Sequence, residues 1–165
     1  MTVTLLIHGV PETPAIWHEL APRLPGDVRA LQLPGFGCGL PDGFTATMDE
    51  YREWLVAAIE SIGEPVDVVG HDWGGFIVWQ MPLRHPSRVA GVIGVNTPHT
   101  PRTASDPIGL LRKRYGDHLY IAQFQDPERR ADKIFDSRIE QTFDALRQHG
   151  IHDRRLGRLL DLAGD

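Results

Sequence analysis

An aspartate between two glycines is the most chemically informative feature of this sequence. It is Asp72, in the pattern Gly70-x-Asp72-x-Gly74. Glycines two positions before and two after a central residue let the backbone turn tightly and lift that residue above a sheet, which is the arrangement of a nucleophile elbow. Most such enzymes carry a serine at this position. Because a carboxylate is already ionised near neutral pH, an aspartate there can attack an electrophilic carbon without a general base.

The product of such an attack is an alkyl-enzyme ester, which water must hydrolyse at the Asp72 carbonyl. That step needs hydrogen-bond donors for the developing oxyanion. We expect them to be the backbone amides of Trp73, directly after the nucleophile, and Val10, in the loop after the first predicted strand. The alternative for Asp72 is an acid that caps a helix, since acids favour helix N-termini.

The segments around these residues predict an α/β fold. The predicted strands cover residues 2–7, 28–33, 66–69 and 90–95, and the predicted helices cover residues 15–24, 47–62 and 75–85. Thr47 and Glu50 form a capping-box pattern at the start of the second helix. The alternation of strand and helix predicts a parallel sheet with right-handed crossovers and helices on both faces. Sites in such sheets form beyond the carboxyl ends of the strands, where both motifs fall.

The sequence changes in character after the fourth predicted strand. Asp106-Pro107 and Asp126-Pro127 each predict a helix start, with an acidic cap before a proline at the first helical position. No strand-like run separates them, so we expect an appended helical lid. The predicted domains are a partial α/β core in residues 1–98, and a partial helical lid with an unmatched tail in residues 99–165.

Composition excludes several classes of function. The 22 acidic and 17 basic residues give a net charge of -5, without the basic face that a nucleic-acid partner requires. Cys38 is the only cysteine, which excludes an intrachain disulfide and suits a reducing compartment. No apolar run is long enough to span a membrane, so we expect a cytoplasmic, soluble protein. No set of side chains has metal-ligand spacing, and we expect no metal or cofactor.

Two runs of residues together resemble the α/β-hydrolase superfamily, and specifically its epoxide hydrolase branch. They are His-Gly-Val-Pro-Glu at residues 8–12 and Gly-His-Asp-Trp-Gly-Gly at residues 70–75. The resemblance covers roughly residues 3 to 147 and implies a partial α/β-hydrolase fold, a mostly parallel sheet flanked by helices. It also implies a small apolar epoxide substrate opened through an ester on Asp72 to give a diol. The residues expected to support the site are His8, Gly9, Pro11, Gly70, His71 and Gly74.

A tyrosine of the predicted lid is the expected acid. Tyr120 aligns with the lid tyrosine that, in the family, hydrogen-bonds the epoxide oxygen and helps to protonate the leaving alkoxide. An alkoxide is too basic to leave unaided near neutral pH, so the chemistry needs such a group. The alternative is a tyrosine that only packs the lid onto the core. The family normally uses a second lid tyrosine, and neither Tyr115 nor Tyr51 matches its position.

Two other functions stay open. The Trp73 indole resembles the halide donor of haloalkane dehalogenases, but those enzymes commonly have an asparagine at the position of Val10, whose side chain cannot donate. Fluoroacetate-type dehalogenases have arginine at the position of Trp73. The second alternative, from a different class, is a binding or interaction module that keeps the pocket without turnover.

The resemblance also implies a relay histidine and its acid partner on loops after later strands. No residue of this chain matches either one, and His149, His152 and Asp153 are not assigned these roles. The chain is therefore expected to be truncated at its C-terminus and to stall at the ester. A disrupted reading frame from about His149 would also explain the unmatched tail. No pattern indicates an oligomeric state.

Overall fold

The structure, a computed structural model, describes residues 2–101, 106–117, 119–125, 133, 137–141 and 144. Contacts within the chain divide it into two units, residues 1–100 and 101–165. The first unit contains every strand among the described residues, and the second contains helices only within that described part. The boundary between the units falls two residues after the predicted domain boundary.

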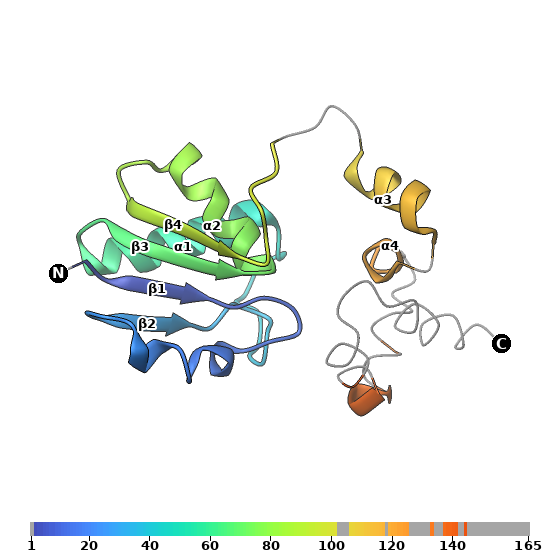
Figure 1. Cartoon of the computed structure of the whole chain (residues 1–165), viewed down its shortest axis with the longest axis horizontal. Helices are drawn as coiled ribbons and strands as arrows, with labels where there is room; N and C mark the ends of the chain where they lie inside the picture. The colour runs from blue at the N-terminus through green and yellow to red at the C-terminus, as the bar shows by residue number, and fades with distance from the viewer. Residues whose placement is uncertain are drawn as a thin grey trace. The chain divides into compact units, whose positions relative to one another are not determined.

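Four parallel strands form the sheet of the first unit, in the order β2-β1-β3-β4 (Figure 1). The strands are β1 Thr4–Ile7, β2 Val28–Leu31, β3 Val66–His71 and β4 Val89–Val95. Ile7, the last residue of β1, lies opposite Leu31 of β2 and Gly70 of β3. The predicted parallel sheet is confirmed. The loops that follow β1 and β3 leave the sheet on the same side, at the carboxyl ends of the strands.

Helices α1 (Met48–Ile62) and α2 (Trp73–Arg84) cover one face of this sheet (Figure 1). The capping box predicted for α1 is present, because the Thr47 hydroxyl accepts from the Glu50 amide at 3.3 Å and the Glu50 carboxylate accepts from the Thr47 amide at 2.9 Å. The main core lies between these helices and the sheet. Its fully buried side chains include Leu5, Ile7, Leu55, Ile59, Val66, Val68, Ile77, Val78 and Met81.

The predicted helix over residues 15–24 is wrong. Two short 3₁₀ turns replace it, η1 (Pro14–Trp17) and η2 (Ala21–Arg23). Trp17 is buried against the sheet and Ala21 and Leu24 pack beside it, but Ile16 and Leu20 are each 38% exposed, so only part of the apolar stripe packs on the sheet. Among the described residues of the first unit, α-helices therefore cover one face of the sheet and 3₁₀ turns lie on the other.

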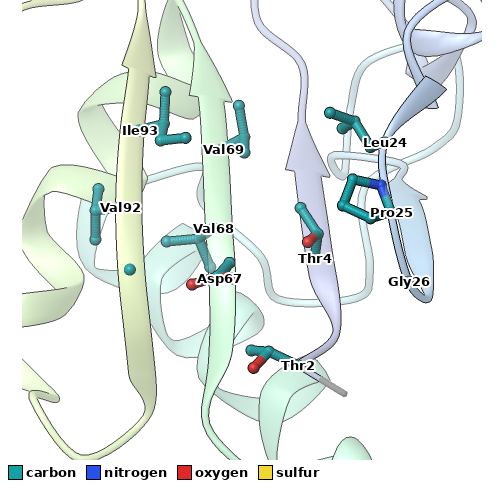
Figure 2. A pocket seen from close by; sticks show the side chains of 11 residues that line it. Thr2, Thr4, Leu24, Pro25, Gly26, Asp67, Val68, Val69, Val92 and Ile93 are labelled. Carbon is teal, nitrogen blue, oxygen red and sulfur yellow. The ribbon is translucent and has the colours of Figure 1, made fainter.

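The face that carries the 3₁₀ turns also holds an open hollow of about 510 Å³ (Figure 2). It lies across β4, β3 and β1, beside the loop Leu24 to Gly26. Ile93, one of its lining residues, is 59% exposed. Neither Asp72 nor Val10 lines this hollow, so it is separate from the predicted catalytic site.

The described part of the second unit contains helices α3 (Pro107–Tyr115) and α4 (Tyr120–Gln123). The predicted start of α3 is confirmed, because the Asp106 carboxylate accepts from the amides of Ile108 at 3.0 Å and Gly109 at 2.9 Å. The Asp126-Pro127 start and the residues from His149 onward lie outside the described residues. In the part of the chain that is described, no helix combines the length and apolarity needed to cross a membrane.

Candidate active site

Asp72 stands at the turn between β3 and α2 in an unusual backbone conformation. Its φ is 50° and its ψ is -116°, a region that residues other than glycine seldom occupy. Such a conformation costs about 1 to 3 kcal/mol and persists only where the surroundings hold it. Asp72 occupies the N-cap position of α2, yet its side chain makes no capping hydrogen bond. The carboxylate is therefore directed to a partner other than its own helix.

The glycines on either side of Asp72 are needed for close approach. A Cβ atom on Gly70 would lie 2.6 Å from the Gly75 amide nitrogen, and one on Gly74 would lie 2.6 Å from the His8 carbonyl oxygen. Neither glycine has a positive φ; Asp72 itself does. The turn thus places its strain on the predicted nucleophile, while Gly70 allows close approach to the start of α2 and Gly74 to the end of β1.

The loop after β1 supplies a donor to the Asp72 carboxylate. The Val10 amide donates to Asp72 Oδ1 at 2.9 Å. This approach depends on Gly9, where a Cβ atom would lie 2.6 Å from the same oxygen. Trp73, the first residue of α2, has an amide with no acceptor within the helix. The geometry thus brings together Asp72 and one of its two predicted amide donors, and leaves the second available at the helix start.

His8 fixes the ends of two strands together. It is fully buried; its Nε2 accepts from the Leu33 amide at 3.0 Å and its Nδ1 lies 3.1 Å from the Gly9 carbonyl oxygen. These partners assign the proton to Nδ1 in a neutral ring. Burial lowers the pKa of His8, which keeps the ring neutral. His8 therefore braces the loop that carries Val10.

An ion pair joins this loop to the elbow. Glu12 Oε2 lies 2.8 Å from His71 Nδ1 and accepts from the Gly9 amide at 3.2 Å. The hydrogen bond that His71 donates to the Glu12 carboxylate raises the pKa of His71, despite partial burial. Burial alone would raise the pKa of Glu12, but the hydrogen bond and the charge of His71 outweigh it and lower that pKa. No role was assigned to Glu12 from the sequence. The acid follows the turn after β1 and His71 precedes the predicted nucleophile, and these two positions could have indicated the pair.

This ion pair predicts how stability depends on pH. The folded pKa of His71 lies above its ordinary 6.5, so the stabilisation is complete below pH 6.5 and is lost as pH rises through the folded value. The folded pKa of Glu12 lies below its ordinary 4.5, so that contribution is lost as pH falls through the lower value. Glu12→Gln should lower the melting temperature most between pH 4.5 and 6.5. Above pH 6.5 the melting temperature of the variant should fall less steeply with pH than that of the unaltered chain.

The control for this measurement is Glu60→Gln, which removes an exposed carboxylate paired with Arg88. It should leave the shape of the melting temperature against pH unchanged. An unaltered fall above pH 6.5 in Glu12→Gln would show that the ion pair does not set this dependence.

Aromatic rings border the elbow. The Trp73 ring lies 6.5 Å from Tyr51 and 6.5 Å from Phe76, measured between ring centroids. Tyr51 is buried and donates its hydroxyl to the Pro34 carbonyl at 2.8 Å, whereas Trp73 is 36% and Phe76 49% exposed. An exposed aromatic surface therefore lies within one helical turn of Asp72.

Tyr120, the predicted acid, is the first residue of α4 in the second unit. Its ring packs edge-on against Phe124 with the centroids 5.3 Å apart. The Arg112 side chain donates to the Ala122 carbonyl at 3.0 Å, which ties α3 to α4. The role of Tyr120 towards a substrate stays a prediction.

Comparisons with known proteins agree on one family. The alpha/beta hydrolase fold model matches residues 3–144. Epoxide hydrolase A of Mycobacterium tuberculosis is 35% identical over 132 residues, which covers 76% of this chain and 41% of that protein. Epoxide hydrolase 3 of Siraitia grosvenorii is 34% identical over 134 residues, covering 76% of this chain and 42% of its own length.

Solved structures give the same result. The crystal structure of an epoxide hydrolase from Vigna radiata matches with a TM-score of 0.75 at 28% identity, covering 90% of this chain and 48% of that one. Epoxide Hydrolase A from Mycobacterium thermoresistibile matches with a TM-score of 0.72 at 31% identity, covering 82% and 45%. The chain thus spans less than half the length of these relatives.

Proposed function

The chain belongs to the alpha/beta hydrolase fold family, and from this premise we propose that it performs epoxide hydrolase chemistry with Asp72 as nucleophile. The observation that carries the proposal is the hydrogen bond from the Val10 amide to Asp72 Oδ1, at 2.9 Å. It joins the loop after β1 to a strained strand-helix turn, the pairing that an aspartate nucleophile and its oxyanion donor require. The names of its relatives point to the same reaction.

In the first step Asp72 opens the epoxide ring. Because the Val10 amide holds Oδ1, Oδ2 is the oxygen left to attack a ring carbon. The bond between that carbon and the epoxide oxygen breaks, and the new carbon-oxygen bond forms an ester. The alkoxide takes a proton from the Tyr120 hydroxyl, the role that the family resemblance implies.

In the second step water attacks the carbonyl carbon of the ester. The carbonyl oxygen, formerly Oδ1, becomes an oxyanion that the amides of Val10 and Trp73 can stabilise. Collapse expels the product oxygen, which takes the proton that was removed from water, and the proton of the resulting Asp72 carboxylic acid restores the Tyr120 hydroxyl. The carboxylate returns and a diol is released, so the net reaction adds one water to the epoxide. A base must take the proton from the attacking water.

Neither histidine beside Asp72 suits that task. His8 is buried with both ring nitrogens committed to the backbone. Glu12 raises the pKa of His71, which favours the protonated ring, and a protonated imidazole cannot accept a proton. We therefore propose that residues 1–165 alone form the ester quickly and hydrolyse it slowly.

The surface beside the elbow favours an apolar substrate. Trp73 and Phe76 expose aromatic rings within one turn of Asp72. Binding sites for small apolar molecules are typically lined by such rings, with few polar groups to orient the reacting atoms. A small epoxide with an aryl or alkyl substituent meets both conditions.

Two reagents separate this proposal from its alternatives. The 165-residue chain is incubated with styrene oxide or with 1-chlorohexane, and intact mass and free chloride are measured. Epoxide opening adds the whole mass of styrene oxide at Asp72, because no group leaves. Chloride release without an epoxide adduct would favour a dehalogenase, and reversible binding of styrene oxide without an adduct would favour a binding module.

Tyr120→Phe tests the proposed acid. Loss of a general acid typically slows such a step by about 10²- to 10⁴-fold, so ester formation on Asp72 should slow by about 10²-fold. The rate is read from intact mass in single-turnover reactions. Tyr115→Phe is the matched control, because it removes a hydroxyl from α3 that accepts from Arg114. Equal rates in the two variants would remove Tyr120 from the mechanism.

A further inference from the structure

Thr97 is a buried polar residue outside the motifs described so far. It lies two residues after the end of β4 and is 5% exposed. Its hydroxyl oxygen is 3.2 Å from the Asp72 carbonyl oxygen and 3.3 Å from the Val95 carbonyl oxygen. One hydroxyl proton serves both acceptors, so Thr97 links the end of β4 to the backbone of the predicted nucleophile.

The Asp72 carbonyl belongs to the strained residue of the elbow. Its φ of 50° and ψ of -116° need support from surrounding groups. The Phe76 amide donates to this carbonyl at 3.2 Å, as the first hydrogen bond of the helix. Thr97 offers a second donor from a different element, and a carbonyl oxygen can accept both.

Thr97 is itself held against α2. The Trp79 indole nitrogen donates to the Thr97 carbonyl at 2.7 Å. A Cβ atom on Gly75 would lie 2.5 Å from Thr97 Cβ, so the two backbones are packed closely. These contacts hold the backbone of Thr97 in place against α2, about one helical turn from the Asp72 carbonyl that its hydroxyl contacts.

We infer that Thr97 is a positioning residue, whose hydroxyl holds the Asp72 carbonyl and so keeps the carboxylate in its attacking orientation. This inference rests on the proposed role of Asp72. Without the hydroxyl, the elbow backbone gains freedom and the attack slows, because bond formation depends on the alignment of the reacting atoms. Binding of an apolar ligand by the aromatic surface is unaffected, since Thr97 does not contribute to that surface.

Two variants of the 165-residue chain separate the hydroxyl from the packing. Thr97→Val keeps the shape and removes the hydroxyl, whereas Thr97→Ser keeps the hydroxyl and removes a methyl group. Single-turnover ester formation from styrene oxide should slow about five- to tenfold in Thr97→Val, the effect of one lost hydrogen bond, and less than about twofold in Thr97→Ser. The dissociation constant for the corresponding diol should change by less than about twofold in both.

Amide hydrogen exchange gives a readout that does not depend on the reaction. The Phe76 amide should exchange about tenfold faster in Thr97→Val and at the normal rate in Thr97→Ser. If the unaltered chain forms no ester, the proposed function fails, and this exchange pattern still decides whether the hydroxyl holds the elbow. Equal exchange and equal reaction rates in the two variants would overturn the inference, as would rates that follow the melting temperature alone.

Discussion

Asp72→Asn is expected to abolish covalent labelling of the chain by styrene oxide, lowering the rate by about a thousandfold or more. An amide oxygen is a far weaker nucleophile than a carboxylate, and removal of a catalytic nucleophile commonly has effects of this size or larger. The Val10 amide can still donate to the asparagine oxygen that replaces Oδ1. The variant should therefore fold, and its dissociation constant for the diol should stay within about threefold of the original.

Asp67→Asn is the matched control for this substitution. Asp67 lies on the same strand, β3, but lines the hollow on the sheet face and not the elbow. Its replacement should leave the labelling rate unchanged. Labelling that persists in Asp72→Asn, or that disappears in both variants, would remove Asp72 from its proposed role.

Gly74→Ala should destabilise the fold strongly, by about 3 kcal/mol. The added Cβ atom would fall on the Ile7 carbonyl and lie 2.6 Å from the His8 carbonyl oxygen. Both obstacles are backbone atoms at the end of the central strand β1, which cannot move aside as a flexible side chain can. Overpacking a well-packed interior commonly costs about 1 to 3 kcal/mol, and rigid backbone places this site at the upper end.

Gly39→Ala provides the comparison for Gly74→Ala. A Cβ atom on Gly39 meets nothing within 4 Å, and Gly39 is not among the glycines with positive φ. Its replacement should change stability by less than about 1 kcal/mol and can be mildly stabilising, because it restricts the unfolded chain. Urea denaturation of both variants measures the difference. Equal midpoints would show that the elbow does not need close approach at residue 74.

Local signals predicted most of the fold correctly. The capping box at Thr47 and the acidic cap at Asp106 place helix starts through hydrogen bonds within four residues, so short sequence patterns identify them. The strands follow from short β-branched runs between turns. The helix predicted over residues 15–24 failed because Pro22 interrupts helical hydrogen bonding in its second half, and only part of its apolar stripe packs on the sheet.

The supporting contacts of the site were beyond sequence reasoning. Glu12 and His71 are 59 residues apart, and Thr97 and Asp72 are 25 apart, so each contact exists only once the sheet order is known. The spacing of the elbow glycines predicted a tight turn, but not the particular contacts that require them. Asp72 carries the positive φ itself, while its neighbouring glycines are required by backbone contacts with β1 and α2.

The most direct test of the central claim is an acid-quenched time course of residues 1–165 with excess styrene oxide. Intact mass and peptide mapping locate the adduct, and chromatography measures the diol. We predict one adduct per chain on the peptide that contains Asp72, formed quickly and lost slowly, with little diol beyond one equivalent. An adduct on another residue, no adduct, or rapid multiple turnover without a detectable ester would contradict the account.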